Sequence, residues 1–500
     1  MTPSPRFDFT APVPAVADLG RVHFVAIGGA GMSAVARLML ARGVRVSGCD
    51  ARDSDGLRAL EALGASVAVG HDVTHVENAD TVVVSSAIRE DNPELAAARA
   101  RGLRVLHRSA ALAAVADGRR VVAVAGANGK TTTTSMLAVA LDAAGSEPSY
   151  ASGGEIAQLG GNAAWGAGPD VVVEADESDG SFLVYRPEVA VVTNVQPDHL
   201  DFYGTVEAVQ AAYAAFADSI RPGGLLVACA DDEGSAALAQ RHRDRGRRVL
   251  TYGFDPGADL RVLSSTADGF GSHSRLALVL PTDDGAEASS MTLDLSLRVP
   301  GAHNVLNALA ALLVATAGLR LPAQPVLDGL AAFDGARRRF EVHGLADGVR
   351  VVDDYAHNAP KVAAVVRTAR EVLDRAGRGR LIVLFQPHLY SRTRDFAEGF
   401  ASGLASADHV LLLDIYGARE DPIPGVTTEL IAGPLRDLPG ERVVETGLSF
   451  DAATARTLEL AEDGDLVLTV GAGDVTTLAP RLLATLQKRS LSRVSEGSRP

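Results

Sequence analysis

Cysteine is nearly absent from this 500-residue chain, which contains only Cys49 and Cys229. Two cysteines so far apart suggest neither a disulfide framework nor a zinc site. Aromatic residues are also scarce, at 5% of the sequence, whereas 47% of the residues are hydrophobic and glycine is abundant. This composition is typical of α/β domains, and a chain of this length has room for about three of them.

Basic charge and long apolar runs are missing as well. The formal net charge is -15, which argues against general affinity for nucleic acids. No apolar run approaches the roughly 20 residues of a membrane span, and residues 1–16 lack the pattern of a signal peptide. We therefore expect a cytoplasmic protein that neither binds nucleic acid nor inserts into a membrane.

The most informative stretch is a glycine-rich turn between a predicted strand, 120–125, and a predicted helix. The pattern Gly126-x-x-Gly129-Lys130-Thr131 is a shortened phosphate loop. In such a loop backbone N–H groups and a helix N-terminus bind phosphate oxygens, Lys130 reaches the β- and γ-phosphates, and Thr131 binds Mg²⁺. We predict that ATP binds here. The alternative is an ordinary glycine-rich turn with a surface lysine.

Polar residues follow the next predicted strands of the same region. The acidic segment 174–179 comes at the end of a strand, where carboxylates can hold Mg²⁺; otherwise it is a surface turn. His199 follows another strand and could bind a second divalent ion, orient a phosphate or belong to the surface. Farther along, His303 or Asn304 either caps a helix or contacts the adenine of a nucleotide.

Two further groups of residues point to ligand sites. Near the N-terminus, a turn with Gly29 and Gly31 has the form found in dinucleotide-binding folds, and Asp50 ends the next strand, where a ribose-binding carboxylate is expected. Toward the C-terminus, polar residues follow two strands, at 353–357 and 386–392. Because parallel strands end at one edge of a sheet, these residues predict a polar site there.

The alternation of strands and helices predicts an α/β protein with three domains. We expect a Rossmann-like N-terminal domain at 1–117, a central P-loop ATPase domain with a mostly parallel sheet at 118–334, and a Rossmann-like C-terminal domain at 335–488. Residues 255–290 are predicted to form a hairpin or small sheet within the central domain. The tail 489–500 lacks apolar periodicity and is predicted to be disordered.

Taken together, these motifs resemble the Mur ligase family of peptidoglycan synthesis over about residues 20–485. The resemblance is carried by Gly28–Ser33, Ser85–Ile88, Asp91–Glu94, Gly126–Thr133, Glu174–Asp179, Asn194–His199, His303–Asn307, Asp353–His357, Phe385–His388, Asp421–Val426 and Gly471–Asp474. It implies an enzyme that uses ATP and Mg²⁺ to activate the carboxylate of UDP-N-acetylmuramate as an acyl phosphate, which L-alanine then attacks. We expect a monomer or a weak homodimer.

The resemblance also implies a role for each matching residue. The catalytic residues would be Lys130, Glu174, His199, His357 and Arg392. ATP would contact Gly126, Ala127, Asn128, Gly129, Lys130, Thr131, Thr132, His303, Asn304, Arg339 and Asp354. The other substrates would contact Gly29, Ala30, Gly31, Met32, Asp50, Ser85, Ser86, Tyr355 and His388. Thr131, Glu174 and His199 would bind Mg²⁺.

Several positions depart from the family pattern. Ala127 and Asn128 replace a usual threonine and histidine, and Leu389 stands where a basic residue is common. No lysine lies between Lys130 and Lys361, so the carbamylated lysine of other family members is absent. Three alternatives stay open: a ligase that attaches a recovered tripeptide to the same sugar nucleotide, an NAD-dependent dehydrogenase, and a non-catalytic nucleotide sensor.

Overall fold

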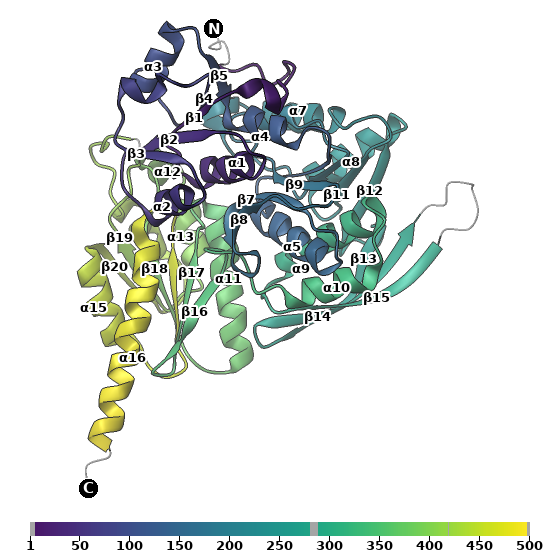
Figure 1. Ribbon diagram of the computed structural model, residues 1–500. Coiled ribbons are helices and arrows are strands. Elements are labelled where there is room, and N and C mark those ends of the chain that lie inside the picture. Colours follow the sequence, from purple (N-terminus) through teal and green to yellow (C-terminus); the bar gives the residue numbers. More distant parts are fainter. Residues whose placement is uncertain (1–5, 281–288, 419, 498–500) are drawn as a thin grey trace. The chain divides into compact units, whose positions relative to one another are not determined.

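A computed structural model describes residues 6–280, 289–418 and 420–497 of the chain (Figure 1). It contains three separate sheets, each with its own helices, so the predicted α/β fold with three domains is confirmed. The chain forms two compact units. The first ends at Asp334 and holds the first two sheets, and the second holds the third sheet together with the short stretches 267–271 and 299–301. Each unit is described by itself.

The N-terminal sheet has five parallel strands in the order β3-β2-β1-β4-β5. Its strands are β1 (Val22–Val25), β2 (Val46–Asp50), β3 (Ser66–Val69), β4 (Thr81–Val84) and β5 (Arg104–His107). Its helices are α1 (Ala30–Ala41), α2 (Asp55–Ala62), α3 (Pro93–Ala100) and α4 (Arg108–Ala116). Apolar side chains of α1, α2 and α4 pack on one face, and those of α3 pack on the other.

The central sheet is mostly parallel and has the order β15-β14-β13-β12-β11-β10-β6-β9-β7-β8. Its strands are β6 (Arg120–Ala125), β7 (Ser149–Ile156), β8 (Gly161–Ala164), β9 (Asp170–Glu174), β10 (Val189–Val192), β11 (Leu225–Cys229), β12 (Arg248–Gly253), β13 (Leu260–Asp268), β14 (Gly271–Leu280) and β15 (Ser289–Leu297). Within the predicted range 255–290 the structure has strands β13 and β14 of this sheet, and β14 pairs antiparallel with β15, most of which lies beyond that range. Residues 281–288 lie outside the described residues.

The helices of the central domain cover the sheet and carry the phosphate turn. They are α5 (Lys130–Ala143), α6 (Leu200–Tyr203), α7 (Val206–Asp218), α8 (Glu233–Asp244), α9 (Ala302–Leu313) and α10 (Ala323–Ala332), with a π-helical turn at Val314–Gly318. Helix α5 is almost entirely buried and packs against α9 and α10, so its N-terminus is fixed in place.

The C-terminal sheet has the order β16-β17-β21-β18-β19-β20, and only β16 runs antiparallel to its neighbour. Its strands are β16 (Glu341–Ala346), β17 (Val349–Asp354), β18 (Leu381–Phe385), β19 (His409–Leu413), β20 (Val443–Leu448) and β21 (Leu466–Val470). Its helices are α11 (Ala359–Ala376), α12 (Tyr390–Asp395), α13 (Ala397–Leu404), α14 (Glu429–Asp437), α15 (Phe450–Leu460) and α16 (Leu478–Gly497). Helices α11, α13 and α14 pack on one face, and α15 and α16 pack on the other.

The prediction of a disordered tail after residue 488 is wrong for most of its length. Helix α16 continues to Gly497, and residues 498–500 lie outside the described residues. The buried side chains of Leu482 and Leu486 anchor this helix to the sheet, and Arg489 donates to the carbonyl oxygens of Leu458 and Ala461. Weak apolar periodicity therefore did not identify the end of a helix that tertiary contacts hold in place.

No helix within the described ranges combines the length and the apolar character that crossing a bilayer requires.

Candidate active site

The phosphate turn joins β6 to α5, as the sequence predicts, and two of its glycines are required by the backbone. Gly129 has a φ of 86°, and a Cβ atom there would lie 2.5 Å from Oδ1 of Asn307. Gly126 has a φ of 139°, and a Cβ atom there would lie 1.9 Å from Oγ1 of Thr193. A side chain at either position would clash with a neighbouring strand end or helix, so the turn adopts this conformation only with glycine.

Lys130 begins α5 and is held at the turn by two contacts. Its Nζ donates to the carbonyl oxygen of Gly126 at 2.7 Å and forms an ion pair with Glu177 at 2.7 Å. Burial alone would lower the pKa of Lys130, but the carboxylates of Glu177 and Asp176 outweigh it and raise the pKa above its usual value. The lysine is therefore charged at neutral pH and mostly withdrawn from water.

Thr131 and Glu174 meet beside this lysine. The Thr131 hydroxyl donates to Oε1 of Glu174 at 3.0 Å, and the backbone N–H of Gly153 donates to Oε2 at 2.6 Å. Glu174 is the last residue of β9, which pairs with β6, so the sheet itself places the carboxylate next to the turn. A hydroxyl and a carboxylate are hard oxygen donors, and this pair fits the ligand preference of Mg²⁺.

His199 lies beyond the end of a strand in the central sheet. It follows β10 in a left-handed conformation, with a φ of 54°, and so belongs to the same edge of the sheet. Its Nε2 lies 3.7 Å from Oε1 of Glu177 and 3.8 Å from Oδ2 of Asp198. The described contacts thus bring His199 to the acid that pairs with Lys130, and its role as a metal ligand stays a prediction.

Asparagine side chains fix the rest of the turn. The backbone N–H of Asn128 donates to Oδ1 of Asn194 at 2.8 Å, and its side-chain amide donates to Gln196 at 3.0 Å. Asn304 is buried at the start of α9 and accepts a bond from Asn307 at 3.2 Å. Asn307 in turn accepts from the Thr133 hydroxyl at 3.1 Å.

Four more of the predicted residues lie on α5, on α9 or in the turn between β6 and α5. The amide bonds link α9 to α5, so Asn304 lies near the phosphate turn, whereas His303 is exposed. Within the turn, Ala127 is buried, and Thr132 is buried in the first turn of α5.

The N-terminal glycine turn has a different set of contacts. The backbone N–H of Gly28 donates to Oδ2 of Asp50 at 2.9 Å, so the acid at the end of β2 lies against the turn. Gly29 precedes α1, which begins at Ala30, and Met32 is buried in its first turn. A Cβ atom on Gly31 would lie 2.7 Å from Nη1 of Arg108.

Residues that were not predicted join this turn to the acidic segment. Arg108 donates to Asp176 at 2.6 Å, and Nε2 of His107 lies 3.3 Å from Asp179. Ser86, one of the two predicted serines after β4, hydrogen-bonds to Asp179 and lies 3.2 Å from Nε2 of His107; Ser85 precedes it directly. The only signal in the sequence was the basic pair His107 and Arg108 at the end of a strand, and this pair looks like an ordinary helix start.

The C-terminal unit has its own polar site at the ends of β17, β18 and β21. Asp354 accepts from the backbone N–H groups of Phe340 and Ala356, both at 2.7 Å. Burial raises the pKa of Asp354 to about 6, against the opposing effect of Arg339. The guanidinium of Arg339 lies 5.1 Å from the ring centre of Tyr355, so the two predicted residues are neighbours.

The two loops with histidines meet as predicted. The rings of His357 and His388 lie 5.8 Å apart, and Arg392 donates to the carbonyl oxygen of His357 at 3.4 Å. Burial lowers the pKa of His357 well below its usual value, and the charges of Lys361 and Arg392 act in the same direction. His357 is therefore a neutral imidazole at neutral pH, a form that can accept a proton or a hydrogen bond.

Three protein-family profiles cover these sites. The chain matches the Mur ligase family catalytic domain over residues 21–120, the Mur ligase middle domain over 124–315 and the Mur ligase glutamate ligase domain over 338–473. This chain belongs to the Mur ligase family. It is a ligase, and the ligases of this family depend on ATP.

Individual relatives sharpen the placement within the family. The UDP-N-acetylmuramate–L-alanine ligase of Kineococcus radiotolerans is 55% identical over 96% of this chain and 99% of its own length. That of Mycobacterium bovis is 48% identical over 95% and 96%. Among solved structures, the UDP-N-acetylmuramate–alanine ligase of Thermotoga maritima matches with a TM-score of 0.76 at 28% identity, over 94% of this chain and 99% of that one. A murein peptide ligase from Psychrobacter arcticus matches at 24% identity with a TM-score of 0.66, which supports the fold alone.

Proposed function

We propose that this chain joins L-alanine to the carboxylate of UDP-N-acetylmuramate in the cytoplasm, with ATP as the energy source. The relatives at 48–55% identity carry that activity in their names, and they match this chain over almost its whole length. The observation that carries the proposal is the buried Lys130 at a glycine turn, next to Thr131 and Glu174. This arrangement suits the transfer of a phosphoryl group, which is the step that activates a carboxylate.

Each part of the phosphate site has a task in that step. The backbone N–H groups of the turn and the N-terminus of α5 would bind phosphate oxygens, and Lys130 would neutralise charge on the phosphoryl group being transferred. Thr131 and Glu174 would hold Mg²⁺, which when bound neutralises phosphate charge. Asn304, at the start of α9, would contact the adenine.

Lys130 must exchange its partner for this to happen. In the structure its charge is matched by Glu177, so a phosphate that takes the lysine leaves that carboxylate without its cation. A second positive charge, such as that of Mg²⁺, would offset the loss. The site would therefore favour a nucleotide that arrives with its metal over a free phosphate group.

The N-terminal turn is the proposed site of the sugar nucleotide. Asp50 would accept hydrogen bonds from hydroxyl groups of the ligand, and the start of α1 at Gly29, Ala30 and Gly31 would face its diphosphate. Met32, Ser85 and Ser86 would complete this contact surface. Asn162, which donates to the carbonyl oxygen of Ala30 at 2.8 Å, holds the helix start in place.

We assign the amino acid to the polar site of the C-terminal unit. The neutral imidazole of His357, the ring of His388 and the guanidinium of Arg392 would orient the amine and the acyl phosphate, with Tyr355 beside them. Arg339 and Asp354 would contact the nucleotide. Attack by the amine on the acyl phosphate forms the amide bond and releases phosphate, and water must be excluded until then.

A phosphate-release assay tests the proposal directly. The purified chain is given ATP, Mg²⁺ and UDP-N-acetylmuramate, and L-alanine or the tripeptide L-alanyl-γ-D-glutamyl-meso-diaminopimelate is then added. Phosphate release that requires L-alanine supports the proposal. Release only with the tripeptide would assign the chain to the recycling reaction, and no release with either substrate would overturn both assignments.

A further inference from the structure

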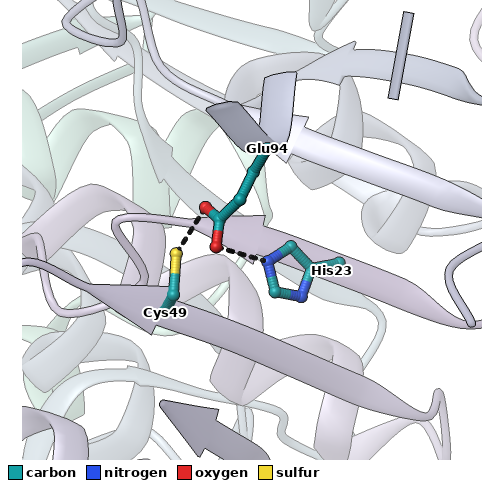
Figure 2. Close-up of side chains that lie close together, drawn as sticks. All are labelled: His23, Cys49 and Glu94. Atoms are coloured by element: carbon teal, nitrogen blue, oxygen red, sulfur yellow. Dashed lines mark hydrogen bonds and ion pairs between the residues drawn. The ribbon is translucent and has the colours of Figure 1, made fainter. Parts of the chain in front are cut away.

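A cluster of metal-binding side chains lies in the N-terminal domain, on the face of the sheet covered by α3. It consists of His23 on β1, Cys49 on β2, Glu94 on α3, and His71 and His75 from the segment after β3 (Figure 2 shows the first three). Strand alternation explains the arrangement. Val25 and Cys49 are register partners whose side chains belong to the core on this face, and His23, two residues before Val25, points to the same side. None of these five residues belongs to the site proposed above.

Glu94 is the centre of the cluster, and its side chain is completely buried. The Cys49 thiol donates to Oε2 at 2.7 Å, Nδ1 of His71 lies 3.0 Å from Oε2, and Nδ1 of His75 lies 2.6 Å from Oε1. Burial would raise the pKa of Glu94, but the hydrogen bonds from Cys49 and the histidines outweigh it and lower the pKa. A carboxylate that stays ionised inside a domain requires positive charge or protons close to it.

Hydrogen bonds do not account for the buried position of the His23 ring. Its side chain is 2% exposed, and Nδ1 lies 3.0 Å from the Ser47 hydroxyl. Nε2 is buried, points toward Glu94 and has no hydrogen-bond partner among the described residues. Its distance to Oε1 of Glu94 is 3.9 Å, which is too long for a hydrogen bond. Burial lowers the pKa of His23 to about 4, so the ring is neutral at neutral pH and its Nε2 can present a lone pair.

We propose that this cluster is a binding site for a divalent transition-metal ion, with Zn²⁺ as the expected occupant. The ligands would be Nε2 of His23, Sγ of Cys49 and the carboxylate of Glu94, whose ligand atoms all lie within 4.8 Å of one another. Nδ1 of His71 would be the fourth ligand, because it lies 3.1 Å from Sγ and 3.0 Å from Oε2. Zn²⁺ bonds of ~2.0–2.3 Å to a tetrahedral N, S and O set fit these separations after small side-chain movements.

The chemistry of the donors selects this class of ion. A thiolate and imidazoles favour Zn²⁺ and similar metals over Mg²⁺, which requires oxygen ligands. One thiolate and one carboxylate balance the two positive charges, so a metal would replace the thiol proton without leaving net charge in the core. Two bonds of ~2.0 Å at the tetrahedral angle span about 3.3 Å. His23 and Glu94, 3.9 Å apart, would therefore need to approach slightly to bind one ion, which would satisfy Nε2.

The surroundings of the cluster suit a metal site. Ser47 beside Nδ1 of His23 fixes the orientation of that ring, and His75 and the backbone N–H of Asp72 bond to Oε1 of Glu94. The side chains of His71 and His75 remain about one-quarter exposed, which leaves a path from solvent. A bound ion would tie β1, β2 and α3 together, directly before Asp50 at the end of β2.

Cobalt substitution tests the proposal on the full chain. The protein is treated with a chelator, dialysed, and titrated with Co²⁺ in the presence of excess Mg²⁺, which occupies oxygen-rich sites. We expect one equivalent of Co²⁺ to bind with the visible absorption of tetrahedral coordination and a near-ultraviolet thiolate-to-cobalt band. Zn²⁺ should then displace it and abolish both absorptions.

The chain supplies a matched control because it has only two cysteines, both buried. Cys229→Ser should retain the thiolate band, which assigns the sulfur to Cys49 even if Cys49→Ser does not fold. A folded Cys49→Ser variant should lose the band and bind Co²⁺ at least 100-fold more weakly. Absence of the band from the wild-type protein, or its loss in Cys229→Ser, would overturn the proposal and leave the cluster as a network of hydrogen bonds. The readout does not depend on ligase activity.

Discussion

The chain contains two glycine-rich turns that share a backbone plan and differ in their side chains. Residues 28–31 lead from β1 into α1, and residues 126–130 lead from β6 into α5. In the first turn, a carboxylate, Asp50, accepts a backbone N–H of the turn itself. In the second, the corresponding edge of the sheet supplies Glu174 and Glu177, which contact Thr131 and Lys130.

The difference shows that the strand next to a turn determines its chemistry. A helix N-terminus attracts anions in both cases. At the first turn an acid accepts the backbone N–H of Gly28, and its carboxylate would also accept hydrogen bonds from hydroxyl groups of a ligand. At the second turn the acids contact a lysine and a hydroxyl, and the backbone N–H of Asn128 is bound by the amide of Asn194 rather than by an acid. The four predictions that follow test this difference between the two turns.

Removing the lysine should have the largest effect. Lys130→Ala leaves the phosphoryl group without its buried cation, so we expect kcat to fall at least about 1,000-fold. Binding of the sugar nucleotide, measured by calorimetry, should stay within about twofold of the wild type. An equal loss of both would contradict a separation between the two turns.

Neutralising the acid beside the phosphate turn should have the next largest effect. Glu174→Gln removes one of the two proposed oxygen ligands, and we expect kcat to fall about 100-fold with a higher requirement for Mg²⁺. Phosphate release measured across a range of Mg²⁺ concentrations checks this. The control is Glu155→Gln, the same change at an exposed position on β7, which should have little effect.

The same substitution in both turns should give unequal results. Gly129→Ala places a Cβ atom at a positive φ and against Asn307, so we expect the KM for ATP to rise about 10- to 100-fold. Gly31→Ala meets only the end of the flexible Arg108 side chain, and its main effect should be a smaller rise in the KM for the sugar nucleotide. Steady-state kinetics with each substrate varied in turn distinguish the two, and a larger effect at Gly31 would count against the comparison.

Asp50→Asn should have the smallest effect. Asparagine still accepts from the Gly28 N–H, so the turn is kept, but a hydrogen bond from a ligand hydroxyl loses its charge. We expect the KM for the sugar nucleotide to rise about 10-fold, with the KM for ATP unchanged. Asp53→Asn, at an exposed acid nearby, is the control, and an equal response from both variants would show a general electrostatic effect.

Much of the fold could be predicted because most of its helices and strands have clear local sequence patterns. Buried parallel strands such as β6 and β10 appear as short apolar runs, and each glycine turn follows one directly. The edge elements were less visible: the pair β7–β8 contains glycines and polar residues, and α16 continues to Gly497 through a segment with weak apolar periodicity. Their structure depends on tertiary packing, which periodicity does not report.

The strand ends at which the site residues lie could be predicted, but the side-chain pairs that they form could not. Position at a strand end placed Glu174 beside the turn that carries Lys130, and Asp50 beside Gly28 at the other turn, since register alone decides that. The pairing of Lys130 with Glu177 and of Arg108 with Asp176 depends on how one loop folds across two domains. The cluster around Glu94 could not be predicted for the same reason. Rules based on residue spacing detect ligands that lie on one short loop, and these residues come from separate elements.

The acidic segment 174–179 contacts residues at both glycine turns. Glu177 contacts Lys130 of one turn, and Asp176 and Asp179 contact Arg108 and Ser86 beside the other. A nucleotide that took Lys130 from Glu177 would change the contacts of a segment that also contacts residues beside the N-terminal turn. Any coupling between the two turns through this segment would be reciprocal, with each ligand changing the affinity of the other by the same factor.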